Sequence, residues 1–225
     1  MDNYLTRTEA LLGKENLINI QDKTIMIIGL GGVGGTALSA LYRSGFKHFV
    51  LVDNDCVEPT NLNRQIMYDE NDLGKLKTDV CKTKLTKFCG EIDVKTVDLY
   101  VDDKNVTSLI SDVDFVVDAI DFVPGKIGII RECLKKNIPF ISSLGMARRL
   151  DPEQVCLTTL HKTENDPLAK KIRYECRLAN LDLKQIPVVF SKENAIDTGK
   201  ELGSMMMVPS TAGLLIAKYV INKLK

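Results

Sequence analysis

Short apolar runs alternate with longer amphipathic segments along the first two thirds of the chain. The apolar runs have the length and composition of buried strands, and the segments between them have helical periodicity. Strands that alternate with helices in this way are typical of a largely parallel, doubly wound sheet. The expected strands are 25–28, 49–52, 93–97, 114–118 and 139–144, and helices are expected at 9–20, from Gly32 onward, at 75–89 and at 124–136.

The regular alternation ends after Gly145. Short strands are expected at 155–160 and 188–190, on either side of a charged helical segment at 166–180. An apolar stripe along 211–225 predicts a closing amphipathic helix, and we assign Met205–Met207 to the core. The chain contains no repeat or linker, so residues 1–225 are expected to form a single domain. Its fold class is α/β, a Rossmann-like, mainly parallel sheet with a mixed β/α C-terminal part.

A glycine turn follows the first expected strand. Gly29, Gly31 and Gly34 have the spacing G-x-G-x-x-G, and Gly32 begins the next helix. Glycines let the backbone turn tightly and approach a phosphate, which the helix N-terminus favours. Asp53 ends the second strand, where a carboxylate accepts hydrogen bonds from ribose hydroxyls. The pattern predicts a nucleotide site and is compatible with NAD or ATP; the structural alternative is a turn that packs a helix on a sheet.

Polar residues that follow Asp53 favour ATP. Asn61, Arg64, Gln65 and Lys77 supply two cations and two amides. An enzyme that cleaves ATP at its α-phosphate needs such groups, because negative charge builds up there and pyrophosphate must leave. Arginine clamps phosphate oxygens with a planar fork, and lysine supplies a point charge. Each residue alone is more typical of a solvated surface, so the hypothesis depends on their joint spacing.

These segments resemble the ubiquitin-activating-enzyme superfamily, the ThiF/MoeB-like adenylating proteins. The resemblance rests on the glycine turn, Asp53, the segments 61–65 and 74–77, and the Asp-Ala-Ile-Asp sequence at 118–121. It implies that ATP and magnesium are bound. The residues implied to hold the nucleotide are Gly29, Gly31, Gly32, Gly34, Asp53, Asn61, Arg64, Gln65 and Lys77.

The same resemblance implies two further roles and a dimer. Asp121 would help to hold magnesium, as a hard oxygen ligand near phosphates. Arg7 would reach across a homodimer into the partner's site, so the implied catalytic residues are Arg64, Lys77, Asp121 and Arg7. From the residues alone, Asp121 is better explained as a helix N-cap or turn aspartate, and Arg7 as a surface arginine.

The second half resembles one branch of the superfamily, the tRNA threonylcarbamoyladenosine dehydratases. Carrier-activating members usually contain paired C-x-x-C motifs for zinc, and this sequence has none. The resemblance implies a ligase-type enzyme that adenylates the carboxylate of N6-threonylcarbamoyladenosine in tRNA and cyclises it with loss of AMP. Intramolecular closure has a high effective molarity, so no covalent cysteine is needed. The matching segments are Gly145-Met-Ala-Arg, Asp166-Pro-Leu-Ala, Val188-Val-Phe-Ser-Lys-Glu and Val208-Pro-Ser-Thr-Ala-Gly.

Composition constrains the partners and the location. Lys plus Arg and Asp plus Glu each number 30, so tRNA binding requires a local basic surface. The six cysteines show no close pairing and no signal peptide is evident, so a reducing cytoplasmic environment is expected. Cys176 is assigned no catalytic role. The two candidate basic sets are Lys75, Lys77, Lys82, Lys84 and Lys87, and Arg148, Arg149, Lys162, Lys170, Lys171, Arg173 and Arg177.

Other functions remain compatible with the sequence. A related activating enzyme would adenylate the C-terminus of a ubiquitin-like or sulfur-carrier protein. An NAD-linked oxidoreductase would use the same fold and would be indifferent to Lys77. A non-catalytic nucleotide sensor would not need Arg64, Lys77 and Asp121 together. No motif identifies a sulfur-transfer or electron partner.

Overall fold

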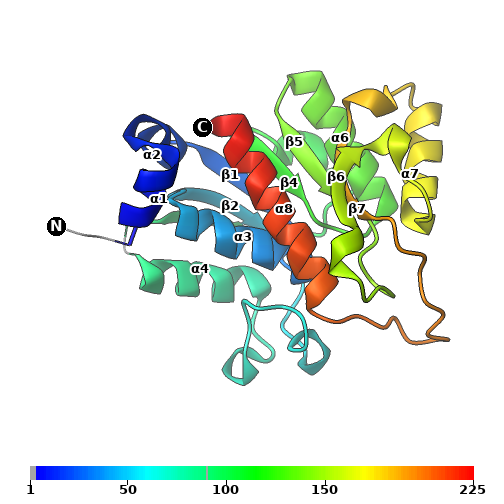
Figure 1. Ribbon diagram of the computed structural model, residues 1–225, viewed down its shortest axis with the longest axis horizontal. Helices are drawn as coiled ribbons and strands as arrows, with labels where there is room; N and C mark the ends of the chain where they lie inside the picture. The colour runs from blue at the N-terminus through cyan, green and yellow to red at the C-terminus, as the bar shows by residue number, and fades with distance from the viewer. Residues whose placement is uncertain (1–3, 90) are drawn as a thin grey trace.

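The computed structural model describes residues 4–89 and 91–225, and its sheet confirms the expected α/β fold. Seven strands form one sheet in the order β3-β2-β1-β4-β5-β7-β6 (Figure 1). All neighbouring pairs are parallel except β6 and β7, which places the single antiparallel strand at the edge. The strands are β1 Thr24–Ile28, β2 His48–Val52, β3 Asp93–Val97, β4 Phe115–Asp118, β5 Phe140–Ser143, β6 Val155–Thr159 and β7 Pro187–Ser191.

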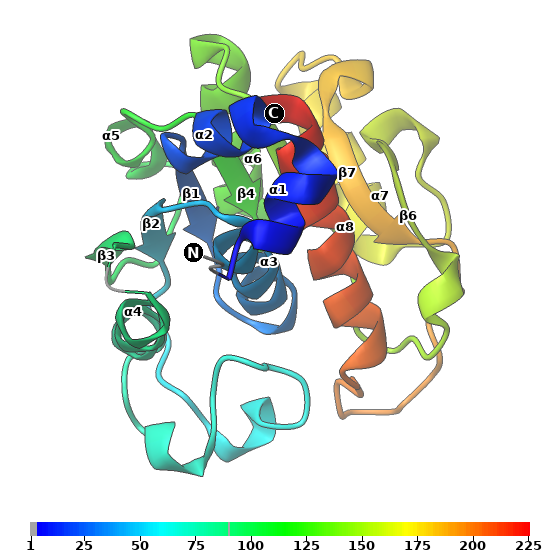
Figure 2. The same cartoon turned by 60° about the vertical axis from the view of Figure 1, so that its left-hand side comes forward.

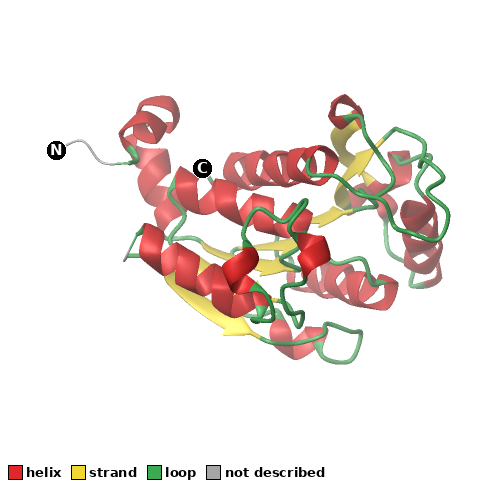
Figure 3. Ribbon diagram, turned by 90° about the horizontal axis from the view of Figure 1, so that it is seen from below, coloured by secondary structure: helices red, strands yellow, loops and turns green. Residues whose placement is uncertain are grey.

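Helices cover both faces of the sheet (Figure 3). Alternate β1 side chains point to opposite faces: Ile25 and Ile27 pack with α3, α4 and α8, whereas Met26 and Ile28 pack with α6 and α7. Helix α2 lies beside the C-terminal end of α8, where the Asn19 Nδ2 donates to the carbonyl oxygen of Leu224 at 2.7 Å (Figure 2). The helices are α1 Thr6–Leu12, α2 Lys14–Gln21, α3 Gly32–Ser44, α4 Lys77–Phe88, α5 Val106–Leu109, α6 Val123–Lys136, α7 Pro167–Leu178 and α8 Met207–Leu224.

Three expectations about the helices were wrong in detail. The helix expected at 9–20 is two helices, because Gly13 between them has φ +83° and ψ 152°. The last helix begins at Met207 and not at 211, with Pro209 in its first turn, where proline is tolerated. Met205–Met207 are 43–46% exposed and lie outside the core. Met205 and Met206 belong to the loop before α8, and Met207 is the first residue of that helix.

Among the described residues, no helix is long and apolar enough to cross a membrane.

Candidate nucleotide-binding and active site

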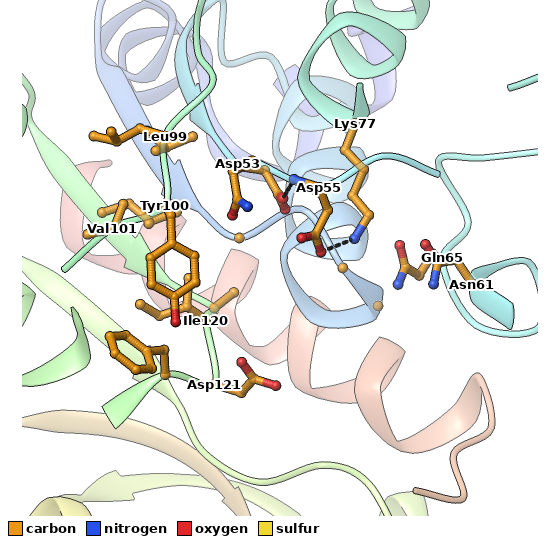
Figure 4. Close-up of a pocket in the computed structure, with 18 of the residues that line it drawn as sticks. Asp53, Asp55, Asn61, Gln65, Lys77, Leu99, Tyr100, Val101, Ile120 and Asp121 are labelled. Carbon is orange, nitrogen blue, oxygen red and sulfur yellow. Dashed lines mark hydrogen bonds and ion pairs between the residues drawn. The ribbon is translucent and has the colours of Figure 1, made fainter. Parts of the chain in front are cut away.

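The carboxyl ends of β1, β2 and β4 open into a cavity of about 320 Å³ (Figure 4). This is where ligands collect in parallel α/β sheets, because the loops there leave the sheet in different directions. The glycine turn, the loop after β2, the segment 61–65, Lys77 and the loop after β4 all border it. The predicted residues that line it are Gly29, Gly31, Gly32, Asp53, Asn61, Arg64, Gln65, Lys77 and Asp121.

The glycines of the turn have two different structural roles. Gly29 has φ +92°, and a Cβ there would lie 2.8 Å from the backbone of Ala119. Gly34 lies beneath the turn, where a Cβ would lie 1.8 Å from the carbonyl oxygen of Gly29. A Cβ on Gly31 would meet the Gln65 side chain at 3.8 Å, an ordinary contact distance. Gly29 and Gly34 are therefore required by packing, whereas Gly31 keeps the backbone open to a ligand.

Asp53 fixes the glycine turn to the end of β2. Its Oδ2 accepts a hydrogen bond from the Leu30 backbone N at 2.6 Å, and its Oδ1 accepts one from the Asp55 backbone N at 2.9 Å. Burial raises the pKa of Asp53, against the lowering effects of the Leu30 amide and of Lys77. Each carboxylate oxygen retains a second lone pair, so the group can still accept from a ribose hydroxyl.

Lys77 extends from the start of α4 into the cavity and finds a counter-ion there. Its side chain is 5% exposed, and its Nζ lies 2.7 Å from Oδ2 of Asp55, whose side chain is 60% exposed (Figure 4). Asp55 therefore holds the ammonium group at the end of the cavity that the glycine turn borders. Sequence reasoning missed Asp55, because an aspartate two residues after Asp53 in a loop has no distinguishing pattern.

The segment 61–65 presents polar groups to the same end of the cavity. Asn61 is buried, and its Oδ1 accepts a hydrogen bond from the Glu58 backbone N at 3.2 Å. Arg64 donates to the carbonyl oxygen of Thr60 at 2.8 Å, which leaves further guanidinium donors for a phosphate. The Gln65 Oε1 is buried and has no hydrogen-bond partner among the described residues. Phosphate oxygens accept hydrogen bonds, so the group of Gln65 that could contact a phosphate is its Nε2 donor, the side-chain atom on the side of Gly31.

Asp118, the last residue of β4, and Asp121, in the loop after it, have different roles. Asp118 is fully buried, and its Oδ2 lies 2.9 Å from the Lys126 Nζ and accepts from the Ser142 Oγ at 2.6 Å. This network ties the loop to α6 and β5. Asp121 is exposed at the edge of the cavity, and the N-cap of α6 is Phe122 without a side-chain capping bond. The N-cap explanation for Asp121 is therefore wrong, and its carboxylate lines the cavity.

The other end of the cavity is apolar and was not anticipated from the sequence. Tyr100 and Phe122 face each other with ring centroids 5.0 Å apart. Leu99, Val101 and Ile120 complete this end (Figure 4). Flat and apolar surfaces of this kind suit a planar base. Sequence patterns do not identify these residues, because they lie in the loops after β3 and β4, where apolar positions show no periodicity.

Arg7 does not line the cavity of its own chain. It is exposed on α1, and Leu5 before it packs against Gly45 at the C-terminal end of α3. The cavity lies at the N-terminal end of α3, which has 13 residues and is therefore about 20 Å long. The structure thus brings the other predicted residues together but leaves Arg7 apart from them.

The fold and the cavity are those of a doubly wound α/β protein with a nucleotide-type site at the glycine turn. The chain belongs to the ThiF family, which matches residues 5–224. It is 34% identical to the tRNA threonylcarbamoyladenosine dehydratase of Bacillus subtilis, over 100% of this chain and 95% of that protein. The dehydratase of Haemophilus influenzae is 30% identical, with the same coverage. The crystal structure of E. coli TcdA, the same kind of dehydratase, in complex with ATP has a TM-score of 0.93 at 32% identity and covers 98% of this chain and 93% of that chain.

Proposed function

We propose that this chain is an ATP-dependent tRNA threonylcarbamoyladenosine dehydratase and that residues 1–225 act as one adenylation domain. The observation that carries this conclusion is the similarity to dehydratases over the full chain, together with a cavity whose two ends suit a base and phosphates. Activation of a ubiquitin-like or sulfur-carrier protein is not favoured, since the dehydratases match over the whole chain. A tRNA substrate agrees with the expected cytoplasmic location.

The polarity of the cavity orients ATP. The adenine lies at the apolar end beside Tyr100 and Phe122, and the ribose hydroxyls reach Asp53. The phosphates lie on the glycine turn near Lys77 and Gln65, and Arg64 adds a second cation. Two cations at the phosphate end stabilise the charge that develops when pyrophosphate leaves.

Magnesium fits this arrangement if the nucleotide supplies most of its ligands. Among the described residues, no group of three or more His, Cys, Asp or Glu side chains is placed to hold a metal ion. Magnesium at phosphate sites typically takes one or two carboxylates, several waters and phosphate oxygens. Asp121 at the edge of the cavity supplies such a carboxylate, and bound magnesium would neutralise phosphate charge.

The reaction has two steps. The threonyl carboxylate attacks the α-phosphorus of ATP, an acyl–AMP bond forms, and pyrophosphate leaves. The ureido group then attacks the acyl carbon and loses a proton, and AMP leaves with the former carboxylate oxygen. The net change in the nucleoside is the loss of one water, and ATP becomes AMP and pyrophosphate. Because both reacting groups belong to one modified adenosine, the tasks of the protein are to position that nucleoside and to stabilise the charge that develops.

A cysteine thioester is not required by this chemistry, and the three buried cysteines are poorly suited to form one. Burial raises the pKa of Cys81 and of Cys176 to about 12, and burial also raises the pKa of Cys133. A thiol with a raised pKa supplies little thiolate at neutral pH. None of the described residues that line the cavity is a cysteine.

The direct test is mass analysis of nucleosides from threonylcarbamoylated tRNA after incubation with the protein, ATP and magnesium. We expect loss of one water from the modified adenosine and one AMP per turnover. Lys77→Met and Asp121→Ala should lower the rate at least about 100-fold while the melting temperature stays near that of the wild type, and Lys82→Ala, an exposed change on α4, should be neutral. No mass change on a verified tRNA, with AMP formed from a ubiquitin-like protein, would replace this function by carrier activation.

A further inference from the structure

We propose that a groove between α6 and α7 binds the anticodon-loop nucleotides next to the modified adenosine, an inference that rests on the proposed function. The groove has a volume of about 960 Å³ and lies where the two helices pack beside each other (Figure 1). It is separate from the nucleotide cavity, and its lining combines apolar side chains with lysines. The occupant that this combination fits is single-stranded RNA.

One face of each helix forms the groove. Val123, Ile127 and Arg131 are spaced by four residues and therefore form one stripe along α6. Lys170 and Tyr174 have the same spacing on α7. The buried stripe of α7 consists of Ala169, Ile172 and Cys176, so the groove face is the one that the core does not use.

Tyr174 gives the groove a stacking surface. Tyr174 is 60% exposed, so its ring is accessible to a ligand. Unpaired bases of RNA loops stack on such rings, with little dependence on base identity. Val123 and Ile127 across the groove are half-buried and supply an apolar opposite wall.

The two basic candidates differ in what accompanies their free lysines. On α4, Lys77 is paired with Asp55 at 2.7 Å and Lys84 with Asp72 at 2.7 Å. The exposed Lys82 and Lys87 lie with Asp79 around a hollow that has no aromatic side chain among its described lining residues. Among residues 4–89 and 91–225, Lys170 and Lys171 form no ion pair within 4.0 Å. Two exposed lysines without protein partners are available to contact phosphates.

The remaining charges of the groove do not cancel the two lysines. Arg131 and Asp103 form an ion pair at 2.7 Å and neutralise each other. Glu175 is half-buried and is the one other carboxylate among the described lining residues. The lining therefore has a net positive charge, which is complementary to RNA.

The groove is continuous with the nucleotide cavity along the chain. Phe122 lines the cavity, and Val123, the next residue and the first of α6, lines the groove. A nucleotide that presents its carboxylate beside Asp121 therefore has the groove directly next to it. The neighbouring nucleotides of the loop can extend along α6 and α7 from that point.

The inference is tested by equilibrium binding of threonylcarbamoylated tRNA over a range of salt concentrations. Lys170→Glu/Lys171→Glu should weaken tRNA binding at least about 10-fold and reduce the slope of log K against log salt by roughly 1 to 2. Tyr174→Ala should weaken binding at least about 5-fold with an unchanged slope, and Tyr174→Phe should bind like the wild type because the ring remains. All variants should bind ATP within about twofold of the wild type, since the groove is separate from the cavity.

A matched control has the same charge change on α4. Lys82→Glu/Lys87→Glu alters two exposed lysines and should change tRNA affinity far less than the α7 variant. If the wild type cyclises the tRNA but the α7 and Tyr174 variants bind it normally, the groove assignment is wrong and the function stands. If the wild type neither binds nor converts verified tRNA, both are wrong. Loss of binding to a ubiquitin-like protein instead of tRNA would make the groove a protein-docking surface and overturn the RNA assignment.

Discussion

Burial disfavours the charged form of the Asp53 carboxylate. Hydrogen bonds from the backbone amides of Leu30 and Asp55 stabilise that form. The same burial that raises its pKa removes competing water from the end of β2. A ribose hydroxyl can therefore donate to an acceptor that is already oriented. In the proposed function, Asp53 would bind the ribose at a cost in folding free energy at neutral pH.

Asp53→Asn should expose this cost as a pH-dependent difference in stability. A raised pKa in the folded state means that the folded protein holds the proton more tightly, so the contribution to stability is present below the ordinary pKa and is lost as the pH rises through the raised value. The free energy of unfolding of the wild type minus that of Asp53→Asn should decrease from pH 4 to pH 7 in urea titrations. ATP binding should weaken by about 1 kcal/mol, the value of one hydrogen bond. A difference that rises with pH would contradict the assignment.

Most elements could be predicted from the sequence because local pattern determines them. The β3 strand was expected at 93–97 and is Asp93–Val97, since alternation and flanking turns define it. The break at Gly13 could not be read from periodicity, because the apolar spacing continues across it. The exposed Met205–Met207 segment was misjudged because hydrophobicity alone does not say whether a partner element covers it.

Some residues of the cavity could be predicted from local sequence pattern, and others are brought together only by the tertiary structure. The glycine turn and Asp53 were predictable because both lie next to strands. Asp55, Tyr100 and Phe122 were missed because they come together only when the loops after β2, β3 and β4 converge. The separate roles of Asp118 and Asp121 also depended on burial, which the Asp-Ala-Ile-Asp sequence does not specify.

We expect alanine substitutions at Gly31 and Gly34 to have different effects, although both glycines belong to the same G-x-G-x-x-G motif between β1 and α3. Gly34→Ala should destabilise the fold by more than about 3 kcal/mol, because its Cβ would lie 1.8 Å from the Gly29 carbonyl oxygen. Gly31→Ala should change stability by less than about 1 kcal/mol, since its nearest contact is at 3.8 Å, yet weaken ATP binding about 10-fold by occupying the space of a phosphate. Urea unfolding and ATP titration separate the two effects; equal loss of stability in both would mean that the motif has one structural role.

At the scale of the whole molecule, three of the four C-terminal segments that resemble the dehydratases, those at 145–148, 166–169 and 188–193, meet in one polar cluster. The Gly145 backbone N donates to Asp166 Oδ2 at 3.0 Å, and Arg149 Nε donates to the Glu193 carbonyl oxygen at 3.1 Å. The Glu193 carboxylate in turn accepts from the Leu150 backbone N at 3.1 Å. These segments lie at the ends of β5 and β7 and before α7, so their shared role is to fix the C-terminal half against the sheet.

Arg7 is the one predicted catalytic residue that a single chain does not bring to the cavity, so its role depends on assembly. We expect a two-fold dimer in which Arg7 of one subunit completes the partner's site, and Arg7→Ala should then lower turnover at least about 10-fold with ATP binding largely retained.

Complementation distinguishes this arrangement from a structural effect on the same chain. Arg7→Ala and Lys77→Ala subunits, each strongly impaired alone, would be refolded together in equal amounts. Random mixing makes about half of the dimers heterodimers, and if Arg7 acts across the interface each of these has one site with both residues intact. About a quarter of the wild-type activity should therefore return. If Arg7 serves its own chain, every heterodimer site lacks one of the two residues, and the mixture should stay as inactive as its components.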